Sequence, residues 1–279
     1  MSNIAPTFAY DAAAADVRVI GTATADGVTS RLFSYATPTG IRRVAELIRP
    51  ELPGSYAAAL FVHWYEPEAH DSNRTQFHSE AHTLARHGVV SLLIETMWSD
   101  RDWFLKRTQA DDLGNSIRQV IELRQALDLL LAEPGVDPQR VAYVGHDFGA
   151  MYGVLLGTAD PRATCYVLMA GTPRFPDWYL YYPRLADPER ATFIAAMAPY
   201  DPIAHIAQLT PAPLLFQFGT ADPHVPVPRA QEFYAAAQEP KQLAWYDAGH
   251  ALNDAARAAR LDWLTAQLQL SPADTCAIA

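Results

Sequence analysis

The stretch "VAYVGHDFGAMYG", residues 141–153, decides the fold of this chain. It has the pattern of a short apolar strand, a Gly-x-Asp-x-Gly turn and the beginning of a helix. Glycine at positions 145 and 149 removes the side chains that would keep strand and helix apart around a strained turn. Asp147 therefore occupies the apex of a sharp bend. The N–H of Phe148 then lies at a helix N-terminus, where it can stabilise a negative charge.

Two further candidate residues follow Asp147 at the ends of predicted strands. Asp222 lies in "TADPHVP", after the apolar run 213–219, and His250 lies in "DAGHALND", before the last predicted helix. A nucleophile, an acid and a histidine occur in this order around such turns. The carboxyl ends of strands are also where open α/β sheets bind ligands. We therefore predict a catalytic triad of Asp147, His250 and Asp222, with Glu95 as an alternative acid that fits the position less well.

Apolar runs of strand length alternate with helical patterns along most of the chain. The runs that suit strands buried on both faces are residues 56–64, 89–95, 140–145, 165–171 and 213–219. The helical patterns cover residues 75–86, 113–132, 149–156, 228–237 and 254–268. Ahead of them, hairpin-like strand patterns cover residues 16–22, 29–40 and, with one helical turn as the alternative, 41–50. The alternation predicts an α/β fold with a twisted, mostly parallel sheet covered by helices on both faces.

The alternation fails between Gly171 and Thr210. Residues 172–209 are rich in proline and aromatic side chains and contain no clear strand. A departure of this length inside such a fold usually carries function. We expect residues 1–279 to form a single domain, with residues 172–209 inserted as a cap.

Composition narrows the partners. Half of the 279 residues are hydrophobic and the formal net charge is −10. A large core and a small-molecule substrate are therefore expected, whereas nucleic acid and anionic membranes are not. A homodimer stays open as an alternative to a monomer.

Location and metal content follow from what the sequence lacks. The chain has two cysteines, no stretch with the pattern of a signal peptide and no apolar segment of about 18 residues. A cytoplasmic protein that does not span a membrane is the expectation. His78 and His82 have the i, i+4 spacing of metal ligands, but a solvated helix face is favoured and no metal is predicted.

These motifs resemble the α/β-hydrolase superfamily over almost the whole chain. "VDPQRVAYVGHDFGAM", "GTADPHVP" and "DAGHALND" are most similar to the branch that contains dienelactone hydrolases and prolyl-oligopeptidase-like esterases. Those relatives carry Ser or Cys where this chain has Asp147. "GHDFGA" instead resembles the Asp turn of epoxide hydrolases and haloalkane dehalogenases. The resemblance implies an α/β-hydrolase fold that acts without a cofactor.

The chemistry of a carboxylate separates these relatives. Attack by Asp147 on a saturated carbon gives an alkyl ester, which water activated by His250 can hydrolyse. Attack on an ester carbonyl would give a mixed anhydride, a poor route for an esterase. Backbone donors from Phe148 and from Trp64 or Tyr65 would hold the oxyanion. The alternative is a dienelactone hydrolase-like esterase or lactonase whose Ser has become Asp, leaving it inactive or able only to bind.

The leaving group depends on the side chains around Asp147. Epoxide opening needs an acid, commonly a cap tyrosine, and the candidates are Tyr179, Tyr181 and Tyr182. A haloalkane would instead need a halide donor, which Phe148 lacks and which Trp64 or Trp178 could supply. We also expect Trp98, Trp103 and Phe104 to line the pocket. An epoxide hydrolase is favoured over a haloalkane dehalogenase.

Overall fold

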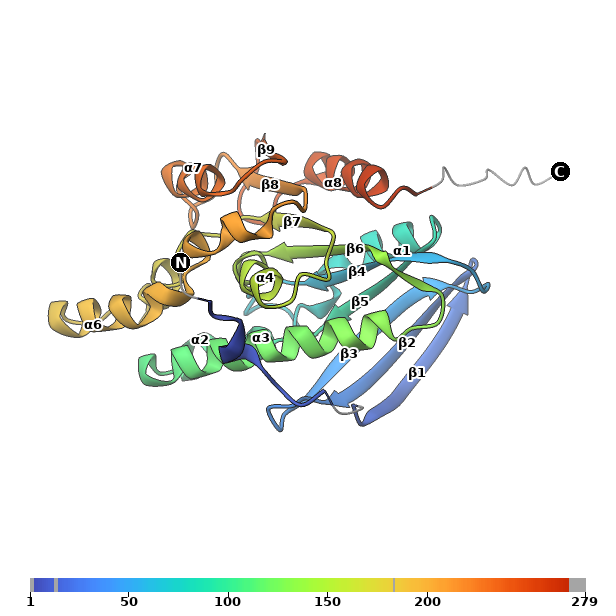
Figure 1. The fold of residues 1–279 in the computed structure, drawn as a ribbon, viewed down its shortest axis with the longest axis horizontal. Coiled ribbons are helices and arrows are strands. Elements are labelled where there is room, and N and C mark those ends of the chain that lie inside the picture. Colours follow the sequence, from blue (N-terminus) through green and yellow to red (C-terminus); the bar gives the residue numbers. More distant parts are fainter. Residues whose placement is uncertain (1–2, 13–14, 183, 271–279) are drawn as a thin grey trace.

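A nine-stranded sheet forms the centre of the described chain (Figure 1). The computed structural model describes residues 3–12, 15–182 and 184–270, and the strands follow the order β1-β2-β3-β5-β4-β6-β7-β8-β9. Their bounds are β1 Val17–Ala25, β2 Val28–Ala36, β3 Arg42–Pro50, β4 Tyr56–Val62, β5 Val89–Ile94, β6 Val136–His146, β7 Cys165–Met169, β8 Leu214–Gly219 and β9 Lys241–Tyr246. From β1 through β5 the neighbours in this order pair antiparallel, and from β5 through β9 they pair parallel. The predicted mixed, mostly parallel sheet is confirmed.

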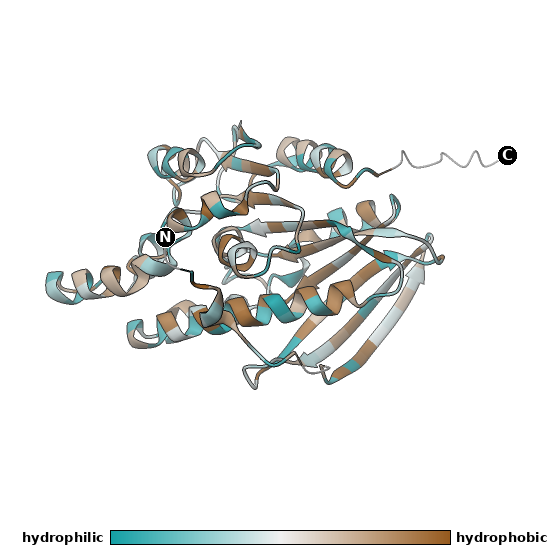
Figure 2. Cartoon of the chain, viewed as in Figure 1, coloured by the Kyte–Doolittle hydropathy of each residue, from teal (hydrophilic) through white to brown (hydrophobic). Residues whose placement is uncertain are grey.

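Burial explains why the central strands read as continuous apolar runs. Every residue of β4, β5, β7 and β8 is buried, as a strand covered on both faces requires. Successive side chains of β4 enter opposite layers, with Leu60 and Val62 in one buried cluster and Ala59 and Phe61 in the other. Figure 2 shows hydrophobic residues along these strands and along α4. At the sheet edge, by contrast, all nine residues of β1 are exposed.

Helices cover both faces of the sheet, as predicted. Three pack on the face that carries Leu60: α3 (Gln109–Leu131), α4 (Phe148–Ala159) and α7 (Val227–Ala236). Two pack on the face that carries Phe61: α1 (His78–Ala85) and α8 (Asp254–Gln267). α3 begins at Gln109, before the predicted residue 113. The sequence did not indicate this first turn because it is polar and shows no apolar periodicity. None of the described helices has both the length and the apolar character needed to cross a bilayer.

Residues 172–209 connect β7 to β8, and their described part contains helices and no strand. The helices are α5 (Pro176–Tyr179), α6 (Asp187–Met197), η4 (Ala198–Tyr200), η5 (Pro202–Ala204) and η6 (Ile206–Leu209). Figure 1 shows α6 extending beyond the strand ends. The other short helices are η1 (Ala5–Phe8), η2 (Arg74–Phe77), η3 (Met97–Ser99) and α2 (Trp103–Lys106). α5, α2 and the loop after β4 lie around the site described next.

Candidate active site

Asp147 lies between β6 and α4, at the strained bend that the sequence predicts. Its backbone has φ 55° and ψ −116°, a conformation that residues other than glycine rarely adopt. The flanking glycines permit the bend, because a Cβ at Gly145 would lie 2.3 Å from the carbonyl oxygen of Gly149. A Cβ at Gly149 would in turn lie 2.2 Å from the carbonyl oxygen of Val62. This close packing of strand and helix holds the carboxylate at the carboxyl end of the sheet.

The Asp147 side chain is buried and changes charge near neutral pH. Only 2% of the residue is exposed, and within the described chain its Oδ1 has no hydrogen-bond partner. Burial raises the pKa of Asp147 to about 7, although the charge of His250 and the N–H groups of Tyr65 and Phe148 lower it. Such a shift is typical of groups that carry chemistry. The Asp147 carboxylate therefore has an oxygen atom that no structural hydrogen bond from the described residues occupies.

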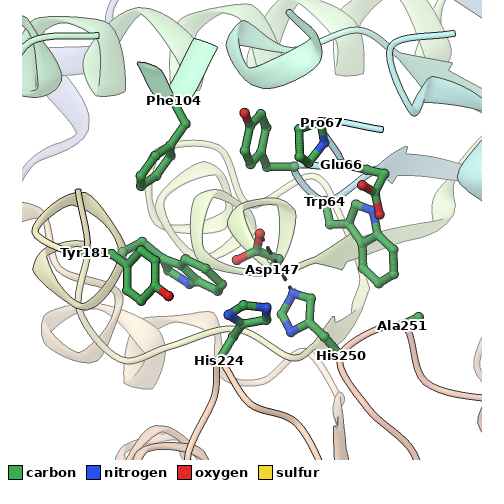
Figure 3. A pocket seen from close by; sticks show the side chains of 11 residues that line it. Trp64, Glu66, Pro67, Phe104, Asp147, Tyr181, His224, His250 and Ala251 are labelled. Carbon is green, nitrogen blue, oxygen red and sulfur yellow. Dashed lines mark ion pairs between the residues drawn. The ribbon is translucent and has the colours of Figure 1, made fainter. Parts of the chain in front are cut away.

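His250 and Asp222 meet as the sequence predicts, and His250 lies between Asp222 and Asp147. The His250 Nδ1–H donates to Asp222 Oδ2 at 2.8 Å, which directs Nε2 toward Asp147. Nε2 lies 4.0 Å from Asp147 Oδ2, as the dashed line in Figure 3 marks. Burial lowers the pKa of His250, but the hydrogen bond to Asp222 and the nearby carboxylates outweigh it and raise the pKa above 6.5. The distance to Asp147 is too long for a direct hydrogen bond.

The loop of His250 is tied to the loop after β4 by a chain of hydrogen bonds. The Trp64 N–H donates to Gln76 Oε1 at 3.1 Å, so the Gln76 amide turns its nitrogen to His146 Nδ1 at 2.6 Å. His146 then carries its proton on Nε2 and donates to the backbone oxygen of His250 at 2.9 Å. Burial and the charge of His250 lower the pKa of His146 well below 6.5. His146 is thus a neutral structural residue that positions the loop of His250.

The same chain of hydrogen bonds distinguishes between the two predicted oxyanion donors of the β4 loop. The Trp64 N–H is engaged by Gln76, so of the two alternatives Tyr65 is the backbone donor that fits this geometry. The N–H groups of Tyr65 and Phe148 approach the Asp147 carboxylate and lower its pKa. These two donors come from the end of β4 and the beginning of α4, and they converge on Asp147.

A cavity of about 480 Å³ opens over Asp147 (Figure 3). Its lining residues are Trp64, Tyr65, Glu66, Pro67, Phe104, Asp147, Trp178, Tyr181, His224, His250 and Ala251. We call it the Asp147 pocket. Its walls are mainly aromatic, and its polar side chains include those of Glu66, Asp147, His224 and His250. Such a mixture is common in small-molecule sites.

Two predicted substrate-binding residues of the segment 172–209 line the Asp147 pocket, namely Trp178 and Tyr181. Tyr179 does not. It is fully buried, and its hydroxyl group lies 2.6 Å from that of Tyr152. Tyr182 is 52% exposed and is not among the lining residues. Two side chains of this turn, three residues apart, reach the pocket, and the residue that follows each of them does not. The sequence alone does not show which residues reach it.

Trp98 and Trp103 lie behind the pocket wall instead of lining it. The Trp98 indole N–H donates to the backbone oxygen of His63 at 3.0 Å, and its ring packs against Phe148. Trp103 packs edge-on against Phe148 and Tyr65. Neither ring is among the lining residues of this cavity, because both fill the core that supports Phe148.

The remaining candidates have structural partners. The Glu95 carboxylate accepts hydrogen bonds from the Val44 N–H at 2.8 Å and the Ser72 hydroxyl at 3.2 Å, so it does not serve His250. His82 lies 3.3 Å from the Ser30 hydroxyl and His78 contacts Glu46. No cluster of potential metal ligands occurs among the described residues.

Phe104, which the sequence analysis expects at the pocket together with Trp98 and Trp103, does line it. Sequence reasoning missed four other lining residues: Glu66, Pro67, His224 and Ala251. His224 follows Asp222 in the same loop, and its N–H donates to Asp222 Oδ1 at 2.8 Å. Its place beside the acid could have indicated it. Phe104 belongs to the four-residue helix α2, which is too short to give a periodic signal.

Comparisons with known proteins identify the fold. No known protein family and no curated protein matches the chain. Among solved structures, an acetyl xylan esterase from Paenibacillus sp. R4 is 16% identical with a TM-score of 0.72, covering 91% of this chain and 88% of that one. Acetyl xylan esterase 1 from Thermoanaerobacterium is 15% identical with a TM-score of 0.68, at coverages of 92% and 88%. A putative dienelactone hydrolase from Klebsiella pneumoniae is 14% identical with a TM-score of 0.64, at coverages of 88% and 99%. These likenesses show that the chain has the α/β-hydrolase fold.

Proposed function

We propose that this protein is a hydrolase in which Asp147 is a covalent nucleophile toward a saturated carbon. One Asp147 carboxylate oxygen attacks the carbon, and the bond to the leaving group breaks with its electron pair. The product of this step is an alkyl ester of Asp147. The strained bend of Asp147 and its carboxylate at the pocket, whose Oδ1 has no hydrogen-bond partner among the described residues, carry the proposal.

The second step uses His250 and the two backbone donors. His250 Nε2 takes a proton from water, and the hydroxide attacks the carbonyl carbon of the Asp147 ester. Tyr65 and Phe148 N–H groups stabilise the tetrahedral oxyanion. The intermediate then collapses, the alcohol leaves with one oxygen of Asp147, and His250 returns the proton. The 4.0 Å separation of His250 and Asp147 suits this step, since the imidazole acts on water and not on Asp147 itself.

The substrate that we favour is an epoxide, as in the sequence analysis, so the leaving group is the ring oxygen. Ring opening produces an alkoxide that must gain a proton. Tyr181 is the predicted cap tyrosine that lines the Asp147 pocket, and Figure 3 shows it on the opposite side of Asp147 from Trp64. Tyr181 is therefore the proposed acid.

A carbon–halogen bond is a second candidate, supported by two indole groups. Trp64 and Trp178 both line the pocket, and within the described residues neither buried Nε1–H has a hydrogen-bond partner. A departing halide would accept hydrogen bonds from such donors. A haloalkane would need no acid, so Tyr181→Phe separates the two: it would abolish epoxide turnover and leave halide release intact.

The structural comparisons support a third candidate, an ester hydrolase scaffold whose serine has become Asp147. The three solved structures described above are named esterases or a dienelactone hydrolase. This candidate predicts no covalent turnover, and it predicts that Asp147→Ser cleaves p-nitrophenyl esters. The covalent mechanism predicts instead that Asp147→Ser is inactive on epoxides and haloalkanes.

Oxygen labelling tests the covalent mechanism. In a single turnover in water enriched in heavy oxygen, the label should enter the Asp147 carboxylate while the first product carries unlabelled enzyme oxygen. A panel of epoxides and haloalkanes run against Asp147→Asn supplies the control. Solvent oxygen in the first product, or equal activity of Asp147→Asn, would rule out the mechanism.

A further inference from the structure

Glu66 places a second carboxyl group in the wall of the Asp147 pocket, and the proposed mechanism does not use it. Glu66 lines the cavity and is half-buried. Within the described residues it forms no ion pair, and its one hydrogen bond is accepted from the N–H of Glu68 at 3.1 Å. Its negative charge helps to raise the pKa of His250. A pocket carboxylate that forms no ion pair with the described residues is available to a ligand.

The rest of the wall is built from aromatic rings. Trp64, Tyr65, Phe104, Trp178 and Tyr181 all line the cavity. Tyr65 and Phe104 stack on each other with centroids 5.8 Å apart. Figure 3 shows Phe104, Tyr181 and Trp64 on three sides of Asp147, with Glu66 beside Trp64. Ring faces attract cations within about 6 Å of their centroids, and quaternary ammonium groups bind in boxes of this composition.

The charge balance of the pocket excludes anions. None of the described residues that line it is Lys or Arg. Asp147 and Glu66 are acidic, Asp222 lies directly behind His250, and burial with the charge of His250 lowers the pKa of His224, which keeps His224 neutral. His250 is the one lining group that gains positive charge near neutral pH, and Asp222 and Asp147 both face it. The net charge of −10 adds to the repulsion of a carboxylate or phosphate.

We propose that the Asp147 pocket takes substrates that carry a quaternary or tertiary ammonium group. The cation lies against the aromatic wall with Glu66 as its counter-charge, and the electrophilic carbon faces Asp147. The inference names the substrate class of the function proposed above and rests on that function for the chemistry but not for the binding. Binding can therefore be tested without turnover.

Choline and its neutral carbon isostere 3,3-dimethylbutan-1-ol test the proposal, because they share shape and hydroxyl group and differ in charge. Dissociation constants of both are measured by NMR titration on the wild-type protein, on Glu66→Gln and on Glu68→Gln. Choline should bind about 5–20-fold more tightly than the isostere. Glu66→Gln should weaken choline and leave the isostere unchanged. Glu68→Gln is the matched control, because it removes an equal charge two residues away and should change neither constant.

Three results would overturn the proposal: choline binding no tighter than the isostere, no binding of either compound at millimolar concentration, or an equal loss of both in Glu66→Gln. These outcomes are independent of the oxygen-labelling result. Tight choline binding without label at Asp147 would support the cation site and contradict the covalent mechanism. Label at Asp147 without a preference for choline would support the covalent mechanism and contradict the cation site.

Discussion

Asp147 combines a strained backbone with a buried carboxyl group, and both features favour reactivity over stability. Burial raises its pKa from 3.8 to about 7 in the folded state, so the folded protein binds this proton more tightly than the unfolded chain does. Ionising Asp147 therefore lowers the free energy of unfolding. The loss is absent below pH 3.8, grows as the pH rises toward 7 and is complete above it.

Asp147→Asn should consequently stabilise the protein at pH 8. Asn has almost the same shape and does not titrate, so we expect a gain on the order of 4 kcal/mol, since the pKa rises by about three units at ~1.4 kcal/mol per unit. The gain should disappear near pH 4. Urea unfolding at both pH values measures it.

Asp222→Asn is the opposite control. Although burial opposes ionisation of Asp222, its hydrogen bonds with His250, His224 and Val225 lower its pKa. That substitution should destabilise the protein at neutral pH. A loss of stability at pH 8 in Asp147→Asn would contradict the account of the buried carboxylate.

At this scale the sequence predicted the residues whose positions a motif determines. Asp147, Asp222 and His250 follow strand ends in a set order, and the structure brings them together. The sequence could not predict Glu66 or His224 as pocket residues, because their access to the pocket depends on how loops fold against each other. Their roles in catalysis or binding stay predictions.

Among the elements, α2 and α5 each contribute an aromatic side chain to the pocket wall, and Arg107 joins them. Its buried guanidinium pairs with Asp112, donates to the backbone oxygens of Tyr179 and Tyr182, and stacks on Phe104 at 4.6 Å. Phe104 lies in α2, and the two carbonyl groups bracket Tyr181. The planar guanidinium therefore fixes the spacing between Phe104 and the segment that carries Tyr181.

Arg107→Lys should loosen this spacing while keeping the charge. An ammonium group cannot reach Asp112 and both carbonyl groups in one plane, so we expect the free energy of unfolding to fall by about 2–4 kcal/mol. KM should rise more than kcat falls, because Asp147 and His250 are not displaced. Steady-state kinetics and denaturant unfolding measure both effects.

Arg101→Lys, an exposed change in the preceding loop, should leave these values as they are. If kcat fell and KM stayed constant in Arg107→Lys, Arg107 would be acting on the chemistry and not on the walls.

Elements buried on both faces were predictable, because continuous apolar runs have few other uses in a soluble domain. The predicted strand 41–50 is β3 (Arg42–Pro50). Elements of one turn, such as α2, give too few residues for a periodic signal. The antiparallel pairing of β3 with β5 was equally out of reach, because the sequence does not state which strands become neighbours.

In the whole molecule, a buried ion pair links the first and last α-helices of the described chain, α1 and α8. Arg260 of α8 donates to Glu80 of α1 at 2.9 Å and to Gln217 of β8 at 2.7 Å. All three side chains are buried. Removing Glu80 leaves the Arg260 charge without a counter-charge, and removing Arg260 leaves Glu80 only its contact with Arg257 at 3.6 Å, whereas removing both leaves neither charge buried.

A double-mutant cycle tests this dependence. Arg260→Met or Glu80→Leu alone should lower the free energy of unfolding by about 3–5 kcal/mol. The double variant should lose less than either single variant, since two apolar side chains of similar volume replace the pair. Strictly additive losses would show that the two charges do not compensate each other.

The hydrogen bonds from Trp64 through Gln76 and His146 to the backbone of His250 also bear on the order in which the proposed site can be assembled during synthesis. The loop that carries His250 is the last part of the proposed triad to leave the ribosome, whereas the three residues that hold its backbone all precede Asp147 in the chain. A chain that ends before this loop therefore contains Asp147 and the two N–H groups beside it but lacks the imidazole that the proposed second step needs.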